Sequence, residues 1–129
     1  MSAVPKPREQ LRMMIVDDSN VMRRRIERSQ QNDRIEVVAT AVNGLDAVTK
    51  FKQLMPDVMT LDLTMPEMDG LETLAELRRI RAEVPVVLCS GYTDECLKSS
   101  PAVGPPPMFL SKPFRMDDLM GAVAAAAAV

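Results

Sequence analysis

Four short apolar runs in this chain each lead into polar residues that can carry chemistry. The runs cover residues 13–16, 58–61, 86–89 and 108–111, and the residues that follow them are Asp17, Asp18, Asp62, Ser90 and Lys112. If the runs are parallel strands of one sheet, all five side chains gather at its carboxyl edge, where open α/β sheets place their binding sites. Three carboxylates, one hydroxyl and one ammonium group suit a divalent metal ion and a phosphoryl group.

The segments between these runs favour helices, which makes the chain an α/β protein. A further strand is expected over Ile35–Ala39, and five strands that alternate with helices predict a parallel sheet covered on both faces. The natural arrangement is the flavodoxin-like doubly wound sheet with strand order 2-1-3-4-5, which sets strands 1 and 3 side by side. Asp17 and Asp18 would then meet Asp62. Residues 1–10 are predicted to form a flexible tail, and residues 11–129 one domain.

The expected helices have recognisable starts and apolar faces. Ser19 or Asn20 can cap the first helix. After the turn at Asn43, an amphipathic helix carries Leu45, Val48 and Phe51. The other helices are expected over residues 71–78, over a short stretch near 94–98 and from about residue 115 onward.

Composition narrows the classes of function. The formal net charge of −2 argues against direct nucleic-acid binding, which usually needs a basic excess, and no apolar stretch is long enough to span a membrane. Cys89 and Cys96 have neither metal-ligand spacing nor a disulfide framework around them, so we expect a cytoplasmic protein. The chain has no histidine, so any phosphohistidine that serves it must belong to a partner.

The acidic residues predict a magnesium site with a nucleophile inside it. Crowded carboxylates repel one another unless a cation compensates them, and Mg²⁺ prefers oxygen ligands, usually one or two carboxylates with waters and a phosphate oxygen. Asp62 is the best candidate to attack phosphorus and carry the group as an acyl phosphate. Lys112 can pair with one phosphoryl oxygen, and the Ser90 hydroxyl can donate to another.

These motifs together resemble the receiver domain of two-component response regulators, over residues 12 to about 125. The resemblance rests on the segments Val16-Asp17-Asp18-Ser19, Asp62 to Gly70, Ser90-Gly91 and Ser111-Lys112-Pro113-Phe114. It implies that Asp62 is the phosphoacceptor and that Mg²⁺ is held by Asp18, Asp62 and the backbone carbonyl of Thr64, with Asp17 acting mainly through a metal-bound water. It also implies that Ser90 and Lys112 bind the phosphoryl oxygens and that Phe109 is the aromatic switch residue.

The same resemblance implies a regulatory protein rather than an enzyme with turnover. A histidine kinase or phosphotransfer protein would donate the phosphoryl group, and the output would be contact with a downstream protein or a second receiver. Stand-alone chemotaxis regulators fit this description, and so does a receiver cut from a larger multidomain regulator, a chemotaxis methylesterase or a hybrid kinase. A phosphohydrolase with an aspartate nucleophile is disfavoured, because Thr64 stands where those enzymes place a second aspartate.

Overall fold

The computed structural model describes residues 10–30, 34–62, 70–90, 108–112 and 114–127. Within them, strands and helices alternate along the chain. The elements are β1 (Leu11–Val16), α1 (Asn20–Gln30), β2 (Ile35–Ala41), α2 (Gly44–Leu54), β3 (Val58–Asp62), α3 (Gly70–Ile80), β4 (Val86–Ser90), β5 (Met108–Ser111) and α5 (Met116–Ala127).

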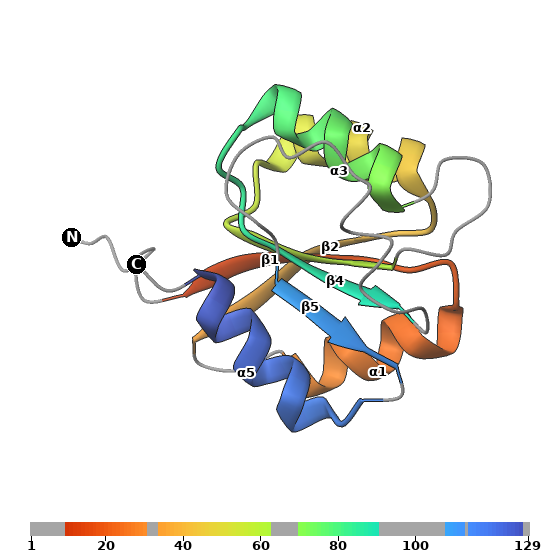
Figure 1. The fold of residues 1–129 in the computed structure, drawn as a ribbon, viewed down its shortest axis with the longest axis vertical. Helices are drawn as coiled ribbons and strands as arrows, with labels where there is room; N and C mark the ends of the chain where they lie inside the picture. The colour runs from red at the N-terminus through yellow and green to blue at the C-terminus, as the bar shows by residue number, and fades with distance from the viewer. Residues whose placement is uncertain (1–9, 31–33, 63–69, 91–107, 113, 128–129) are drawn as a thin grey trace.

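The five strands form one parallel sheet in the order β2-β1-β3-β4-β5, which confirms the predicted fold and strand order. Helices α2 and α3 cover one face of the sheet, and α1 and α5 cover the other (Figure 1). Both faces are therefore buried, which explains why the strands are mostly apolar on both sides rather than alternating apolar with polar residues.

Alternate residues of each strand supply two separate hydrophobic cores. The core under α2 and α3 contains Met14, Met59 and Leu88, whereas the core under α1 and α5 contains Met13, Ile15 and their neighbours. From β3, β4 and α5 this second core receives Val58, Val87, Cys89, Leu119 and Val123. Asp17 and Asp62 continue the alternation of the second core, so both carboxylates lie on the α1/α5 side of the sheet at its carboxyl edge.

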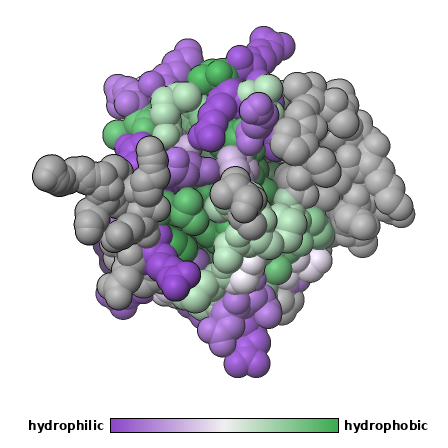
Figure 2. Space-filling view, turned by 90° about the vertical axis from the view of Figure 1, so that its left-hand side faces the viewer, coloured by the Kyte–Doolittle hydropathy of each residue, from purple (hydrophilic) through white to green (hydrophobic). Residues whose placement is uncertain are grey.

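The opposite end of the sheet, where the strands begin, lies at the left of Figure 1. Seen from that side, hydrophobic surface lies in the middle of the molecule between hydrophilic residues above and below (Figure 2). Asp17, Asp18, Asp62 and Lys112 lie at the other edge, because they end or follow strands rather than begin them. Among the described helices, none combines the length and the apolar character needed to cross a membrane.

Two helix starts follow from local hydrogen bonds. The Ser19 hydroxyl accepts a hydrogen bond from the Met22 amide at 3.2 Å, which confirms Ser19 as the predicted cap of α1. Asn43 caps α2, because its side-chain oxygen accepts from the Asp46 amide at 2.8 Å. The Asp46 carboxylate in turn accepts from the Val42 amide at 3.2 Å, so both partners hold the first turn of the helix.

The prediction that Leu45 belongs to the apolar face of α2 is wrong, because Leu45 is 55% exposed. Ala47 and Phe51, four residues apart, define the buried face of the helix. Leu45 is two residues before Ala47, about 200° around the helix from it, so it points to the opposite side. Phe51 and Val48 do pack on the core as predicted.

Strand β2 is longer than the sequence indicated, since it continues past Ala39 to Ala41. Thr40 and Ala41 pair with Ile15 and Val16 of β1, after a register shift between Met13 and Met14. Other predicted features lie outside the described residues: the tail over residues 1–9, the short helix near residues 94–98, and the loop that carries Thr64 and residues 65–69.

Candidate functional site

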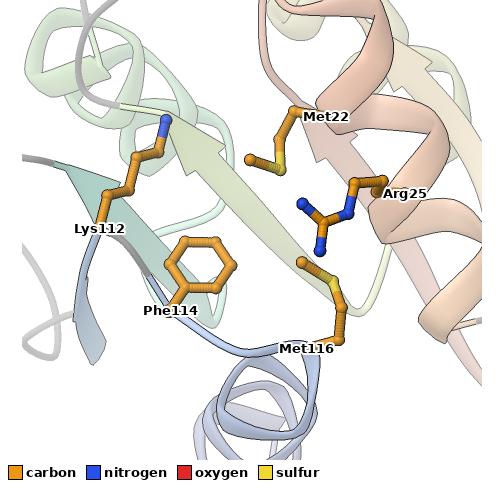
Figure 3. Close-up of a pocket in the computed structure, with 5 residues that line it drawn as sticks. All are labelled: Met22, Arg25, Lys112, Phe114 and Met116. Atoms are coloured by element: carbon orange, nitrogen blue, oxygen red, sulfur yellow. The ribbon is translucent and has the colours of Figure 1, made fainter.

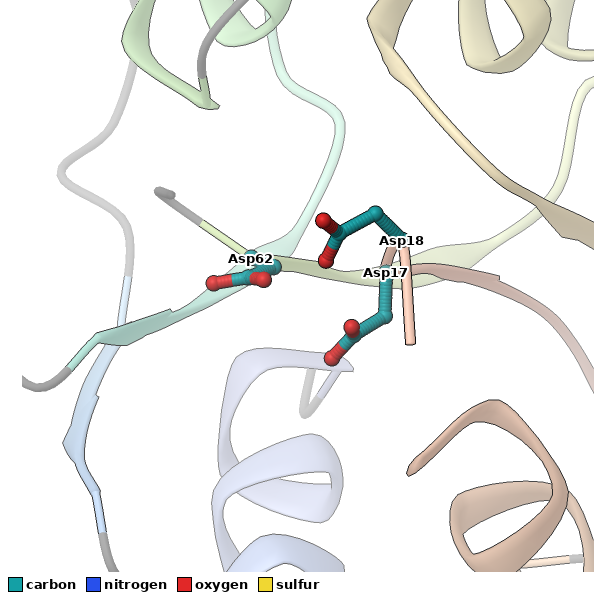
Figure 4. Close-up of side chains that lie close together, drawn as sticks. All are labelled: Asp17, Asp18 and Asp62. Carbon is teal, nitrogen blue, oxygen red and sulfur yellow. The ribbon is translucent and has the colours of Figure 1, made fainter. Parts of the chain in front are cut away.

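The carboxyl edge of the sheet brings together three carboxylates from two neighbouring strands. Asp17 and Asp18 follow β1, and Asp62 ends β3, which pairs with β1 in parallel. One carboxylate oxygen from each residue lies within 4.8 Å of the others, and the three side chains lie close together at the ends of the two strands (Figure 4). The structure thus places these three residues together, as the order of the strands predicted.

Lys112 brings a positive charge to the same place. It directly follows β5, and its ammonium nitrogen lies 3.4 Å from Asp62 Oδ1 and 4.0 Å from Asp17 Oδ2. Lys112 lies two residues beyond Leu110, which packs on the α1/α5 side. Because side chains alternate between the two faces along a strand, both side chains lie on that side of the sheet. We call Asp17, Asp18, Asp62 and Lys112 the acidic site.

Burial makes the ionised form of the carboxylates in the acidic site energetically unfavourable. Asp17 and Asp62 are 3% and 4% exposed, and Asp18 is exposed. Burial, followed by repulsion from Asp62, raises the pKa of Asp17, while a hydrogen bond from the Ser19 amide at 2.8 Å and the Lys112 ammonium act in the opposite direction. Three carboxylates beside one ammonium leave an excess of negative charge in a poorly hydrated place.

The donor set fits a magnesium ion. Two ligands bound to the same Mg²⁺ at 2.0–2.1 Å are at most about 4.2 Å apart, so carboxylate oxygens within 4.8 Å of one another need only small side-chain rotations to share it. The ligands are oxygens, one residue is open to solvent for waters, and the negative excess matches a divalent charge. Sulfur and imidazole ligands, which would favour zinc, are absent from the described part of this cluster.

The other predicted site residues are Ser90, Thr64 and Phe109. The structure describes the backbone of Ser90 but not its side chain. Ser90 ends β4 and pairs with Ser111 of β5, which places its backbone at the same edge of the sheet. Thr64 lies outside the described residues. Phe109 is half-buried and packs on the α2/α3 side of the sheet, so it lies across the sheet from the acidic site.

Sequence reasoning missed the role of Arg23. Its guanidinium donates to the backbone carbonyl of Asp17 at 2.8 Å and to the Asn20 side-chain oxygen at 3.0 Å. These contacts hold the turn that carries Asp17 and Asp18 against the start of α1. A run of three arginines such as Arg23 to Arg25 is typical of a solvated helix face, and nothing in its spacing distinguishes the first arginine from the next two.

Comparison with known proteins assigns the family. Residues 13–124 match the response regulator receiver domain, and the chain belongs to that family. It is 39% identical to the chemotaxis protein CheY of Listeria monocytogenes over 117 residues, which cover 91% of this chain and 98% of that protein. The chain is therefore a receiver domain of the CheY type.

Two further comparisons extend this result. The chain is 42% identical over 97 residues to the protein-glutamate methylesterase/protein-glutamine glutaminase of Clostridium acetobutylicum, but the match covers 69% of this chain and only 28% of that enzyme. Among solved structures, CheY in the CheX-CheY-BeF₃-Mg²⁺ complex of Borrelia burgdorferi is similar, with a TM-score of 0.76, 25% identity and coverage of 94% and 97% of the two chains.

Proposed function

We propose that this receiver is switched by phosphorylation of Asp62. The observation that carries the proposal is the position of Asp62: a nearly fully buried carboxylate at the end of β3 that faces two further carboxylates and lies 3.4 Å from an ammonium group. A buried structural aspartate is commonly paired with a cation such as lysine, but it would not be placed beside two further carboxylates that repel it. The CheY-type similarity over most of the chain supports the same role.

In the proposed reaction, an Asp62 oxygen attacks the phosphorus of a phosphohistidine on a partner protein. The new O–P bond forms as the N–P bond breaks, and the histidine leaves with the bonding electron pair and takes up a proton. Lys112 leaves its carboxylate partners to pair with one phosphoryl oxygen, and the Ser90 hydroxyl donates to another. The donor must be a second protein, because this chain has no histidine.

Magnesium belongs to this proposal. Asp18, Asp62 and the Thr64 carbonyl would hold the ion directly, and Asp17 would hold it through a water molecule. When bound, Mg²⁺ supplies positive charge to the transferring phosphoryl oxygens. Asp17 is suited to an indirect role, because one of its oxygens already accepts the Ser19 amide at 2.8 Å.

The signal would leave the site through Lys112, Ser90 and Phe109. A phosphoaspartate adds charge of roughly −1.5 to −2 and new acceptor oxygens, by analogy with other phosphorylated side chains. Movement of Ser90 toward the phosphoryl group would free space that Phe109, now half-buried, can enter. Phe109 has no hydroxyl, so its burial leaves no polar group unpaired.

The output would be contact with a downstream protein or a second receiver, without direct nucleic-acid or membrane binding, in the cytoplasm. The protein would act as a regulator that assists its own phosphorylation and dephosphorylation rather than as an enzyme. The methylesterase similarity favours one variant of this function, in which the same receiver controls an attached catalytic domain of a larger protein.

The test is phosphorylation by acetyl phosphate in the presence of Mg²⁺, read by intact mass. The wild type should gain one phosphoryl group, and EDTA should suppress the gain. Asp62→Asn should abolish it. Asp117→Asn, which changes an exposed aspartate on α5, is the matched control and should react like the wild type. A full mass gain in Asp62→Asn would refute the proposal.

A further inference from the structure

A cleft lies between α1 and the start of α5, next to the acidic site. Its volume is about 340 Å³, and it is lined by Met22, Arg25, Lys112, Phe114 and Met116. Figure 3 shows the Met22, Arg25 and Met116 side chains extending from the two helices toward the ring of Phe114, with Lys112 on the far side. Lys112 therefore belongs to both places: its ammonium contacts Asp62 and Asp17, and the residue is also one of those that line the cleft.

The walls of the cleft are apolar, and the two charged side chains that line it are Arg25 and Lys112, of which Lys112 is paired with Asp62 and Asp17. Two thioethers and a phenyl ring supply the apolar surface, and none of the described lining residues is acidic. The sulfur of Met116 accepts a hydrogen bond from the Ser29 hydroxyl at 3.2 Å, which ties α5 to α1 on this side. Partly buried Met22, Phe114 and Met116 also pack on the α1/α5 core, so the apolar surface is part of the fold.

Arg25 differs from the other cations of this region. Lys112 contacts Asp62 and Asp17, and Arg23 donates to Asp17 and Asn20. Among the described residues, Arg25 makes neither a hydrogen bond nor an ion pair. Arg25 is exposed, so its guanidinium donors face solvent beside the apolar surface and are open to a carboxylate, which accepts two parallel N–H bonds from arginine.

We propose that this cleft binds a small organic carboxylate that carries an aromatic or similarly bulky apolar group. The carboxylate would pair with Arg25, and the apolar group would lie against Phe114 and the two thioethers, which make favourable contacts with aromatic rings. The volume is at the lower end of the range of small-molecule sites, about 300–1,000 Å³, and five side chains from three segments enclose it.

The test uses 2-naphthoate as the probe and 2-naphthamide, the uncharged compound of nearly the same shape, as its control. The protein is labelled with ¹³C-methyl methionine, and the Met22 and Met116 signals are assigned from Met22→Leu and Met116→Leu. No metal or phosphodonor is needed, so the result is independent of the proposed phosphorylation of Asp62. Arg25→Gln is compared with Arg24→Gln, which changes an exposed arginine of the same helix that does not line the cleft.

We expect naphthoate to shift the Met22 and Met116 methyl signals saturably, with a Kd on the order of 1 mM for a ligand of this size. Arg25→Gln and the amide should each weaken binding by about tenfold, as expected when a charge-assisted hydrogen bond is lost, and Arg24→Gln should not. Equal binding of acid and amide, or equal effects of the two arginine variants, would overturn the proposal. So would the absence of saturation, which would leave the cleft at most a part of a protein interface.

Discussion

Replacing Asp17 by asparagine removes a buried carboxylate from the acidic site and should stabilise the protein when no divalent metal is present. Burial is the largest cause that raises the pKa of Asp17 above its ordinary value of 3.8. The folded state then holds the proton more tightly than the unfolded state, so the free energy of unfolding falls as the pH rises from 3.8 through the raised pKa. Asparagine avoids this loss and keeps an oxygen that can accept the Ser19 amide.

The magnitude follows from the charges around Asp17. Repulsion from Asp62 and from Asp18, each with an oxygen within 4.8 Å, amounts to at least about 3 kcal/mol per pair at an effective dielectric constant of 20, and attraction to the Lys112 ammonium at 4.0 Å amounts to about 4 kcal/mol on the same scale. The two repulsions together exceed the attraction, but solvent around the exposed Asp18 screens its share, so the desolvation of the Asp17 carboxylate, on the order of 1–3 kcal/mol, remains the main cost of its ionised form. We expect Asp17→Asn to raise the free energy of unfolding by about 1 kcal/mol at pH 7, or the Tm by about 3–5 °C.

The assay is urea unfolding in EDTA at a series of pH values from 7 to 4. The advantage of Asp17→Asn should be complete at pH 7 and should shrink as the pH falls through the raised pKa of Asp17 toward 3.8, because folded wild-type Asp17 takes up its proton in that range. Asp117→Asn is the matched control, because Asp117 is exposed, lies outside the acidic site and should change stability by less than about 0.5 kcal/mol. If Asp17→Asn were less stable than the wild type at pH 7, the Lys112 pair would outweigh burial and the reasoning would be refuted.

Three further predictions concern single residues that are not metal ligands. Asn43→Ala should lower the free energy of unfolding by about 1 kcal/mol, because the Asp46 amide loses its capping acceptor; urea unfolding measures it, beside Asn43→Asp, a control that keeps a side-chain oxygen at the cap. Thr60→Val should be neutral or raise stability by about 1 kcal/mol in the same assay, since the buried Thr60 hydroxyl has no partner among the described residues. Burial raises the pKa of the Cys89 thiol to about 12, so Cys89 should resist iodoacetamide at pH 8 in the folded protein and react once urea unfolds it; equal rates in both states would show that the thiol is accessible.

The sheet and most of the acidic site could be predicted because the relevant signals are local. Each apolar run stops where its strand stops, and a parallel sheet places all those ends on one edge. Asp17, Asp18, Asp62 and Lys112 therefore converge without any need to know how side chains pack. The chemistry-bearing residues were found for the same reason: a carboxylate after a fully apolar strand is conspicuous in the sequence.

The errors concern properties that depend on distant parts of the chain. The end of β2 is set by its pairing with Ile15 and Val16 across a register shift, and small residues such as Thr40 and Ala41 carry little strand signal of their own. The exposure of Leu45 depends on which helix face meets the sheet. Arg23 and Arg25 look identical in the sequence, but they differ in the structure. Arg23 contacts the turn that carries Asp17, whereas Arg25 has no partner among the described residues.

The central claim is that Asp62 itself carries the phosphoryl group, and chemical trapping of the acyl phosphate tests it most directly. After reaction with acetyl phosphate and Mg²⁺, sodium borohydride reduces a phosphorylated aspartate to homoserine, and peptide mass spectrometry locates the new residue. The account predicts homoserine at position 62 and unreduced aspartate at positions 17 and 18. Homoserine at position 17 or 18, or a phosphate that survives borohydride on a serine or threonine, would contradict it.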